Sequence, residues 1–538
     1  MLNSLPDSVP DLKEMVVEFH GKMEDLGQEN ISLHQEVDGF KQEVQFLREE
    51  LRLLRQQIFG RKSEKYGLET ENGAVLFPEW EDDEKPPVNE EPKKSIEVEG
   101  HVRKKSGRKA IPDHLPRVIV EHDLPENEKV CNCGCMMSRI SDETSEQLDM
   151  SPVRYQVIHH VRFKYACKSC EGLESEGGTV KIAPLPEQII PKSIATPRLL
   201  AHIITAKFCD ALPFYRQEGQ FFRSGIEISR ATMCNWAVQV YNRCKPLLEL
   251  LKLEILSGFL INADETHLQV LNEPGREAQS KSYMWVFRGG LPDKPVLYFQ
   301  YHPSRSGKVA EEFLSRYQGC VQTDGYAGYN FLDSKPGITH AACWAHVRRK
   351  FMDTIKAAGG SHGHGKADEA LVTIRKLYQI EKEVKDLKPE EIALQRLEKS
   401  QPILIEFEKW LQDNAQKTPP KSLLGKAFAY TLGQWTRLTR YLQDGRVRMD
   451  NNLAENSIRP FVVGRKNWLF NGTPEGARAS AFFYSIIETA KSNNLDPYKY
   501  LCHLFENLPL AKTEDALKAL MPQSCGLEKQ YRRSELEK

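Results

Sequence analysis

Three carboxylates that lie far apart in the chain stand in sequence contexts that suit metal-dependent phosphoryl chemistry. Asp264 lies within the β-like stretch GFLINADETHLQVL, Asp324 ends a short β-like stretch in GCVQTDGYAGY, and Glu455 lies in NNLAENSIRPFVVGRKNWLF. Carboxylate oxygens are hard ligands that suit Mg²⁺ or Mn²⁺, and converging carboxylates are costly unless cations neutralise them. Each acid alone is more simply a surface residue, so the prediction depends on whether the fold brings all three together.

The elements that must position the two aspartates follow a defined order. From residue 257, three β-like segments (GFLINADETHLQVL, SYMWVFRGG and PVLYFQY) precede an amphipathic helix, SGKVAEEFLSRYQG, and a short strand that ends at Asp324. This β-β-β-α-β order is typical of a ribonuclease-H-like fold, in which the first and fourth strands are neighbours. Asp264 and Asp324 should then face each other. The stretch ITHAACWAHVRRKF predicts a further strand that leads into a helix.

The third acid is predicted to lie on a helix. Asp450 or Asn451 can cap a short helix that Pro460 stops. On this helix Glu455 shares a face with Asn452 and Arg459, since the three are spaced three and four residues apart. A Glu docked beside the two aspartates completes a site for two metal ions, which activate the attacking oxygen and stabilise the leaving oxygen in phosphodiester displacement.

Basic residues lie close to these acids and suit a phosphate backbone. The residues predicted to bind DNA in this way are Arg348, Arg349, Lys350, Arg459, Arg465 and Lys466. Trp468 and Phe470 could stack on a splayed base or wedge beside the scissile step. The alternative is that both are core residues that anchor the helix of Glu455, and the sequence leaves this choice open.

Segment 10–60 carries the clearest periodic signal and predicts a coiled-coil dimerisation helix. Apolar residues alternate steps of three and four from Val16 to Ile58, a heptad seam with Asn30 at an a position. A buried Asn there selects register and favours two strands, and opposite charges at the flanking g and e positions favour a parallel homodimer. The alternative is a long single helix that packs on its own protein.

Segment 118–192 contains a cysteine cluster that predicts a zinc-ribbon-like domain. The cysteines are Cys131, Cys133 and Cys135 in CNCGC, and Cys167 and Cys170 in YACKSC. Four thiolates around one Zn²⁺ can fix a small domain that has little core. The predicted ligands are Cys131, Cys133, Cys167 and Cys170, although three cysteines compete for two places in the first knuckle. A β-like stretch, 153–165, separates the knuckles; the alternative is that the thiols are free and buried.

The remaining boundaries follow from composition and helical pattern. Segment 61–117 is predicted to be a linker, acidic and then basic, since Leu68 to Gly100 holds 11 acidic and 3 basic residues and RKKSGRK follows. Segment 193–250 is helical, either a DNA-binding helix-turn-helix in which Ser229 is an N-cap or an ordinary helical hairpin. The other predicted segments are 251–351 and 449–492, the two parts of the catalytic core, 352–448, a helical insertion, and 493–538, a helical tail.

Composition argues against several classes of protein. The 538 residues are 40% hydrophobic and 28% charged, as in multidomain globular proteins. No apolar run approaches 18 residues and the N-terminus has no basic start with an apolar core, so neither a membrane span nor a secretory signal is expected. Twelve cysteines in so long a chain do not suggest a disulfide scaffold, and a cytoplasmic protein with some cysteines on metal is expected.

Four motifs in order, ADETHLQV, QTDGYAGY, CWAHVRRKF and AENSIRPFVVGRKNWLF, resemble the transposases of the insertion-sequence-66 type. FGRKSEKYG, LPFYRQEG and SIIETAKSNNLDPYKYL are also similar to that family, so the resemblance covers nearly the whole chain. It implies an Asp-Asp-Glu DNA transposase whose acids are Asp264, Asp324 and Glu455, with a zipper, a zinc-binding domain and a helical insertion. The implied partners are terminal inverted repeats, target DNA and small accessory proteins of the same element.

The chain departs from the family pattern at two places. CNCGC replaces the more frequent C-x2-C-G-G, and Asn456 stands where Arg is more common. The overall prediction is a multidomain α/β polynucleotidyl transferase that uses Mg²⁺ or Mn²⁺ and carries Zn²⁺. Water hydrolyses a phosphodiester to leave a 3′-hydroxyl, which then attacks target DNA. Two alternatives stay open: a ribonuclease-H-like nuclease that does not join strands, and a non-catalytic, zinc-containing dimeric DNA-binding protein.

Overall fold

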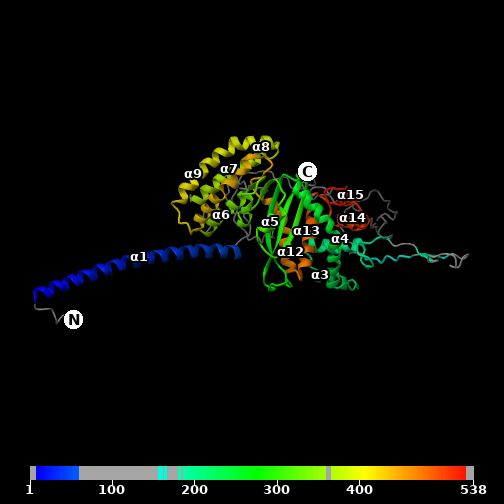
Figure 1. Ribbon diagram of the computed structural model, residues 1–538, viewed down its shortest axis with the longest axis horizontal. Coiled ribbons are helices and arrows are strands. Elements are labelled where there is room, and N and C mark those ends of the chain that lie inside the picture. Colours follow the sequence, from blue (N-terminus) through cyan, green and yellow to red (C-terminus); the bar gives the residue numbers. More distant parts are fainter. Residues whose placement is uncertain are drawn as a thin grey trace, which may run out of the picture. The chain divides into compact units, whose positions relative to one another are not determined.

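The computed structural model describes residues 8–59, 155–161, 163–166, 180–182, 186–358 and 365–528 (Figure 1). The chain comprises two compact units, Met1–Pro78 with Pro186–Lys538, and Glu79–Leu185. In the described part of the chain, no helix is both long enough and apolar enough to cross a membrane.

A five-stranded mixed sheet forms the centre of the larger unit. Its strands, in spatial order, are β5 (Lys294–His302), β4 (Lys281–Leu291), β3 (Leu260–Gln269), β6 (Gly319–Gln322) and β7 (Ile338–Ala341). β3, β4 and β5 pair antiparallel, whereas β6 pairs parallel with both β3 and β7. Aromatic and β-branched side chains fill the strands, and Trp285, Phe287 and Phe299 are fully buried.

The predicted pairing of the first and fourth strands of this region is confirmed. β3 and β6 are parallel neighbours, with Asn262 opposite Gln322. Asp264 and Asp324 each lie two residues beyond that pair, so they occupy equivalent positions on two neighbouring interior segments of the sheet. Side chains two residues apart on a strand point to the same face.

The helix between β5 and β6 is shorter than predicted. α5 spans only Lys308–Phe313, because the chain turns after it to enter β6 at Gly319. This residue has a φ of +142°, and a Cβ there would lie 2.6 Å from the carbonyl oxygen of Phe259. The entry to β6 therefore requires glycine.

Helix α13 (Pro474–Ser492) covers the edge strand β5, and α4 (Arg230–Ser257) also packs on this side of the sheet. Ser485 and Thr489 of α13 accept backbone N–H bonds from Phe299 (2.7 Å) and Leu297 (3.0 Å) of β5. These hydroxyls take the place of a further strand, so β5 does not present an open edge.

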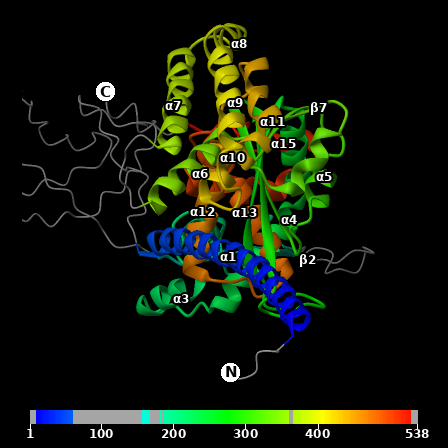
Figure 2. The same ribbon diagram turned by 90° about the vertical axis from the view of Figure 1, so that its left-hand side faces the viewer.

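A helical region lies between β7 and the helix that carries Glu455. Its helices are α6 (Trp344–Ala357), α7 (Lys366–Val384), α8 (Pro389–Gln395), α9 (Gln401–Ala415), α10 (Leu423–Gly433) and α11 (Trp435–Thr439). Trp344 packs against Phe407 and Trp435, with ring centroids 6.4 Å and 6.0 Å away. Figure 2 shows α7, α8 and α9 as a group that extends away from the sheet.

Helix α12 (Asn452–Trp468) corrects one prediction, because Pro460 lies inside the helix and does not end it. An internal Pro costs about 3 kcal/mol through a lost hydrogen bond and a steric clash. Ile458 and Phe461 flank it, and both are buried on the side of α12 that packs against β3 and β4. Burial of such side chains contributes about 1.5–3 kcal/mol each. This packing offsets the cost of the internal Pro, so the helix continues beyond it.

Helix α1 (Val9–Phe59) is one continuous helix along the predicted heptad segment. Its seam is exposed within this chain: Val16 is 62%, Leu26 64% and Leu54 52% exposed. Glu50, near the C-terminal end of α1, forms an ion pair with Lys426 of α10. The seam from Val16 to Leu54 is therefore not covered by the protein's own described residues, which argues against the single-helix alternative.

The helices before the sheet agree with the sequence pattern. α2 spans Pro197–Phe208, and α3 (Phe214–Arg223) is joined to α4 through Gly225, which has a φ of +75°. The predicted N-cap of α4 is confirmed, since Ser229 Oγ accepts the backbone N–H of Thr232 at 3.1 Å.

The smaller unit contains an antiparallel pair, β1 (Lys164–Ala166) and β2 (Val180–Ile182). The predicted β-like stretch over 153–165 is wrong for residues 155–161, which have no regular structure. Val157 is 95% exposed, and β-branched residues favour strands only where they have a surface to pack on. The cysteine cluster, Cys131, Cys133, Cys135, Cys167 and Cys170, and the linker 61–117 lie outside the described residues.

Candidate active site

The three predicted acids come from β3, from the residues after β6 and from α12. The pKa of Asp264 is raised well above its ordinary value, first by burial and then by the negative charges of Glu265, Asp324 and Glu455. Asp324 and Glu455 are thus near enough to act on Asp264. The fold therefore brings the three acids near one another, beside the paired interior strands β3 and β6.

This cluster suits a hard divalent cation. Neighbouring carboxylates ionise together only when positive charge lies among them. Glu455 Oε1 is buried without a hydrogen-bond partner, whereas Oε2 accepts from Arg349 at 3.1 Å. A cation among Asp264, Asp324 and Glu455 would offset the repulsion between their carboxylates, so these residues fit Mg²⁺ or Mn²⁺.

A buried network of side-chain amides joins the three elements that carry the acids. Asn262 of β3 donates to Gln322 of β6 at 3.1 Å and to Asn451, at the start of α12, at 2.8 Å. Asn451 donates in turn to the carbonyl oxygen of Ala263 at 3.0 Å. The sequence prediction missed Asn262 and Gln322; the available signal was an amide residue two positions before each aspartate.

Loss of this network should destabilise the fold around the acids. Asn451→Ala would remove one of the two acceptors of the Asn262 amide and the side-chain donor to the Ala263 carbonyl, at a cost of about 1–3 kcal/mol. We expect a lower melting temperature than for Asn456→Ala, which changes an exposed Asn on the same helix and should stay within about 0.5 kcal/mol of the parent. Equal melting of the two variants would contradict the role of the network.

A fourth acid, Glu265, lies next to Asp264 but has its own partners. Its carboxylate accepts from Arg305 at 2.6 Å and from the Tyr329 hydroxyl at 2.7 Å. Burial raises the pKa of Glu265, and the Tyr329 and Arg305 hydrogen bonds oppose that shift. These bonds brace β3 beside Asp264. The prediction missed Arg305 and Tyr329, although Tyr329 closes the GCVQTDGYAGY motif.

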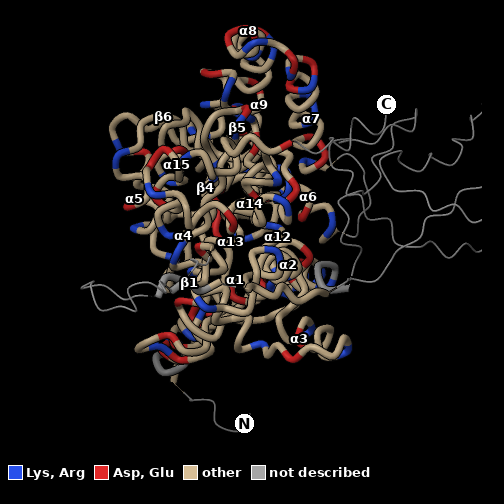
Figure 3. Tube along the Cα trace, turned by 90° about the vertical axis from the view of Figure 1, so that its right-hand side faces the viewer, with Lys and Arg blue, Asp and Glu red and all other residues tan. Residues whose placement is uncertain are grey.

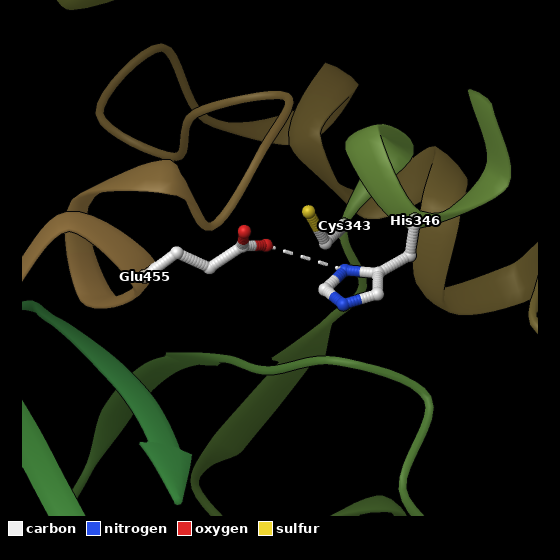
Figure 4. A group of neighbouring side chains, drawn as sticks. All are labelled: Cys343, His346 and Glu455. Atoms are coloured by element: carbon white, nitrogen blue, oxygen red, sulfur yellow. Dashed lines mark ion pairs between the residues drawn. The ribbon is translucent and has the colours of Figure 1, made fainter. Parts of the chain in front are cut away.

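Helix α6 presents a second group of side chains to Glu455. His346 Nδ1 lies 3.6 Å from Glu455 Oε1, and Cys343, at the N-cap of α6, accepts the backbone N–H of Asn451 on its Sγ at 3.1 Å. In Figure 4 the side chains of Cys343, His346 and Glu455 point toward one another. The prediction did not include Cys343 or His346, although three-residue spacing places them on one face of the helix.

The basic residues predicted to bind DNA lie in different environments. Lys350, Arg459 and Lys466 are exposed, whereas Arg349 is bonded to Glu455 and Arg465 donates to Thr266 at 3.0 Å. In the view of Figure 3, basic and acidic residues are interspersed along α3, α5 and α8.

Burial argues against one of these predictions. Arg348 is only 4% exposed, so its guanidinium has little surface from which to reach a phosphate. It lies between Val347 and Phe351, which are both fully buried, because this face of α6 packs on the helical region. The run Arg-Arg-Lys therefore divides between the interior and the surface, which the sequence alone does not show.

Trp468 is also placed by packing. It is 9% exposed, and its ring lies 5.6 Å from Phe461 and under Lys207 at 5.7 Å. Phe470 is 44% exposed. The burial favours the core alternative for Trp468, since a covered ring has no free face on which a base could stack. Of these two aromatic residues, Phe470 is the one whose ring is exposed to solvent.

Comparisons with known proteins find similar sequences along most of the chain. Family models match as follows: Transposase IS66 family over residues 192–479, zinc-finger binding domain of transposase IS66 over 128–171, Transposase C of IS166 homeodomain over 46–120, and IS66 C-terminal element over 485–523. Two similar proteins are the uncharacterized proteins y4jD and y4qI of Sinorhizobium fredii (strain NBRC 101917 / NGR234). The first is 33% identical over 428 residues, 77% of this chain and 81% of the relative. The second is 31% identical over 430 residues, 77% of each chain. With matches along most of its length, the chain belongs to the IS66 transposase family.

Proposed function

We propose that this protein cleaves the ends of an insertion sequence and joins them to target DNA, with Asp264, Asp324 and Glu455 as the catalytic residues. The observation that carries the proposal is the convergence of these acids, in which Asp324 and Glu455 raise the pKa of Asp264. The strand order β5-β4-β3-β6-β7 supports a ribonuclease-H-like core. The family match over residues 192–479 supports the transposase role.

In the proposed mechanism, the cation and the protein's own side chains have different roles. Bound Mg²⁺ or Mn²⁺ would stabilise charge on the attacking and leaving oxygens of a phosphodiester. Asp264 lies within β3 and Asp324 lies two residues after β6, at matching positions of two paired neighbours, so the sheet holds both in place. Glu455 closes the site from α12. Arg349 orients Glu455 through the 3.1 Å bond, and the amide network sets the spacing of the three acids. Water attacks a phosphodiester at the element end, whose P–O bond breaks to give a 3′-hydroxyl and a 5′-phosphate. That 3′-hydroxyl then attacks a phosphodiester of the target DNA and displaces the target's own 3′-oxygen.

Labelled duplexes that carry the element ends test this function. A transposase should cut the duplex and join the new 3′ end to a second DNA. Cutting without joining would support a nuclease, and binding without cutting would support the non-catalytic alternative.

Lys466 and Arg459 are proposed to hold the DNA backbone, since both are exposed on the helix that carries Glu455. Changing either to Ala should weaken binding to many sequences alike. If each contacts one phosphate, the slope of log affinity against log salt should fall by about one per residue. Arg348→Ala should instead lower the melting temperature, because that residue is buried. An unchanged salt slope for both exposed residues would place the DNA elsewhere.

The exposed seam of α1 is proposed to form a parallel two-stranded coiled coil with a second copy, in which Asn30 faces its own symmetry mate. A peptide of residues 12–60 should dimerise. Asn30→Leu should raise its stability and loosen its choice of oligomeric state. Analytical ultracentrifugation measures both peptides, and a wild-type peptide that stays monomeric at tens of micromolar would remove the proposal.

Zn²⁺ is proposed to bind Cys167, Cys170 and two of the three cysteines of CNCGC, supported by the zinc-finger match over residues 128–171. Helices α3 and α4, with the capped turn at Ser229, are proposed as a further DNA-binding element. Small accessory proteins of the same element are proposed as additional partners.

A further inference from the structure

Cys343, His346 and Glu455 form a cluster that the proposed cleavage chemistry does not use as a unit. One potential ligand atom from each, Sγ, a ring nitrogen and a carboxylate oxygen, lies within 4.8 Å of the other two. Figure 4 shows the three side chains converging from the start of α6 and from α12. The set combines a soft, a borderline and a hard ligand, which differs from the all-oxygen set of Asp264 and Asp324.

Two atoms of this cluster are buried without hydrogen-bond partners. These are His346 Nδ1 and Glu455 Oε1, which face each other at 3.6 Å. That separation is too long for a hydrogen bond. It is close to the distance of about 3.4 Å between two ligands that each bind one tetrahedral ion at about 2.1 Å. A shared ion would satisfy both atoms.

We infer that Cys343, His346 and Glu455 bind one borderline divalent transition-metal ion, of the Zn²⁺ or Co²⁺ class. Imidazole and thiolate ligands select such ions over Mg²⁺. The Asn451 backbone N–H already donates to Cys343 Sγ at 3.1 Å, and this hydrogen bond would stabilise the negative charge of a metal-bound thiolate. Water would complete the tetrahedron.

Access and charge also bear on this site. The side chains of His346 and Glu455 are 24% and 22% exposed, which gives the ion a path, whereas Cys343 is fully buried. Burial raises the pKa of the Cys343 thiol to about 12, so the ion must displace the thiol proton to solvent. Arg349 opposes a cation here, but it bonds Oε2 of Glu455 and leaves Oε1 open.

The inference goes beyond the proposed function, because ion binding requires neither DNA nor Asp264. The full chain, with its native zinc retained, is titrated with Co²⁺ in equilibrium dialysis. Two quantities are measured: the amount of Co²⁺ bound per chain, and the charge-transfer absorption from thiolate to cobalt. The wild type should bind one more Co²⁺ per chain than Cys343→Ser, which should lack the additional absorption. His346→Gln should lower the affinity of this site for Co²⁺ by at least about 10-fold. Loss of a residue that only hydrogen-bonds to a metal ligand already costs that much, and His346 is proposed as a ligand itself.

Two control variants separate the explanations. Cys244→Ser removes a buried thiol outside the cluster and should leave Co²⁺ binding unchanged. Asp264→Asn should abolish cleavage under the proposed function yet retain the additional Co²⁺. Loss of that Co²⁺ in Asp264→Asn would assign the ion to the aspartates and overturn the inference. Equal binding and spectra in the wild type and folded His346→Gln would also overturn it, even if Cys343→Ser did not fold.

Discussion

Asp264→Asn, Asp324→Asn and Glu455→Gln should each lower strand cleavage by at least about 10³-fold. Metal-ion catalysis contributes several kcal/mol of transition-state stabilisation, and a loss of about 4 kcal/mol corresponds to that factor. Each variant removes one charged ligand from a site that three elements build together. Cleavage of a labelled element end in Mg²⁺ measures the effect. Asp293→Asn makes the same chemical change on the exposed turn between β4 and β5 and should cleave normally.

The same variants should bind DNA and remain folded. The pKa of the partly buried Asp264 is raised first by burial and then by the negative charges of Glu265, Asp324 and Glu455, so its ionised form is unfavourable without a cation. Its neutralisation therefore removes an unfavourable charge, and the melting temperature of Asp264→Asn should equal or exceed that of the wild type. Normal cleavage by folded Glu455→Gln would refute the assignment of the third acid.

Trp468→Ala should be among the most destabilising single changes at the end of α12. Truncation of a buried Trp costs about 3–5 kcal/mol through lost burial and the cavity that remains. The ring packs on Phe461, whose own ring lies 5.2 Å from Tyr484 of α13. Its loss should loosen the contact between α12 and α13. We expect a clear fall in melting temperature and reduced activity on every DNA substrate alike.

Phe470→Ala is the matched control for Trp468→Ala. Phe470 lies two residues further on and is 44% exposed, so its loss should change stability by no more than about 0.5 kcal/mol. If the aromatic residue that contacts DNA lies in this segment, this variant should lose affinity for splayed or single-stranded ends by about 1–3 kcal/mol. If Trp468→Ala had a normal melting temperature but bound DNA ends poorly, Trp468 would be the residue that contacts DNA and the core role assigned to it would be wrong.

Local pattern was sufficient to predict the elements whose residues repeat with a clear period. The strand that carries Asp264, the cap at Ser229 and the long helix α1 each follow from a few neighbouring residues. The parallel pairing of β3 with β6 also followed, because the order of strands and helix along the chain limits the ways to close the sheet. These features depend on short-range chemistry or on connectivity.

The errors arose where distant packing overrides local preference. Pro460 was expected to end its helix, but burial of its flanking residues outweighs the cost of an internal Pro. Arg348 and Lys350 look alike in sequence, yet only the burial of one face of α6 separates them. The roles of Asn262 and Asn451 depend on a contact between residues 189 positions apart. No periodicity within either segment encodes such a contact.

The placement of the helical region between the aspartates and Glu455 has a consequence during protein synthesis. The ribosome must add about 200 residues after Asp264 before α12 is complete, which takes about 10–40 s at ~5–20 residues per second. The nascent chain therefore carries a zipper helix and two aspartates well before it carries the third acid. Copies on neighbouring ribosomes of one message have that interval in which to pair through α1. If the proposed dimerisation and cleavage are both correct, each polypeptide can acquire a partner from its own transcript before it becomes able to cut DNA.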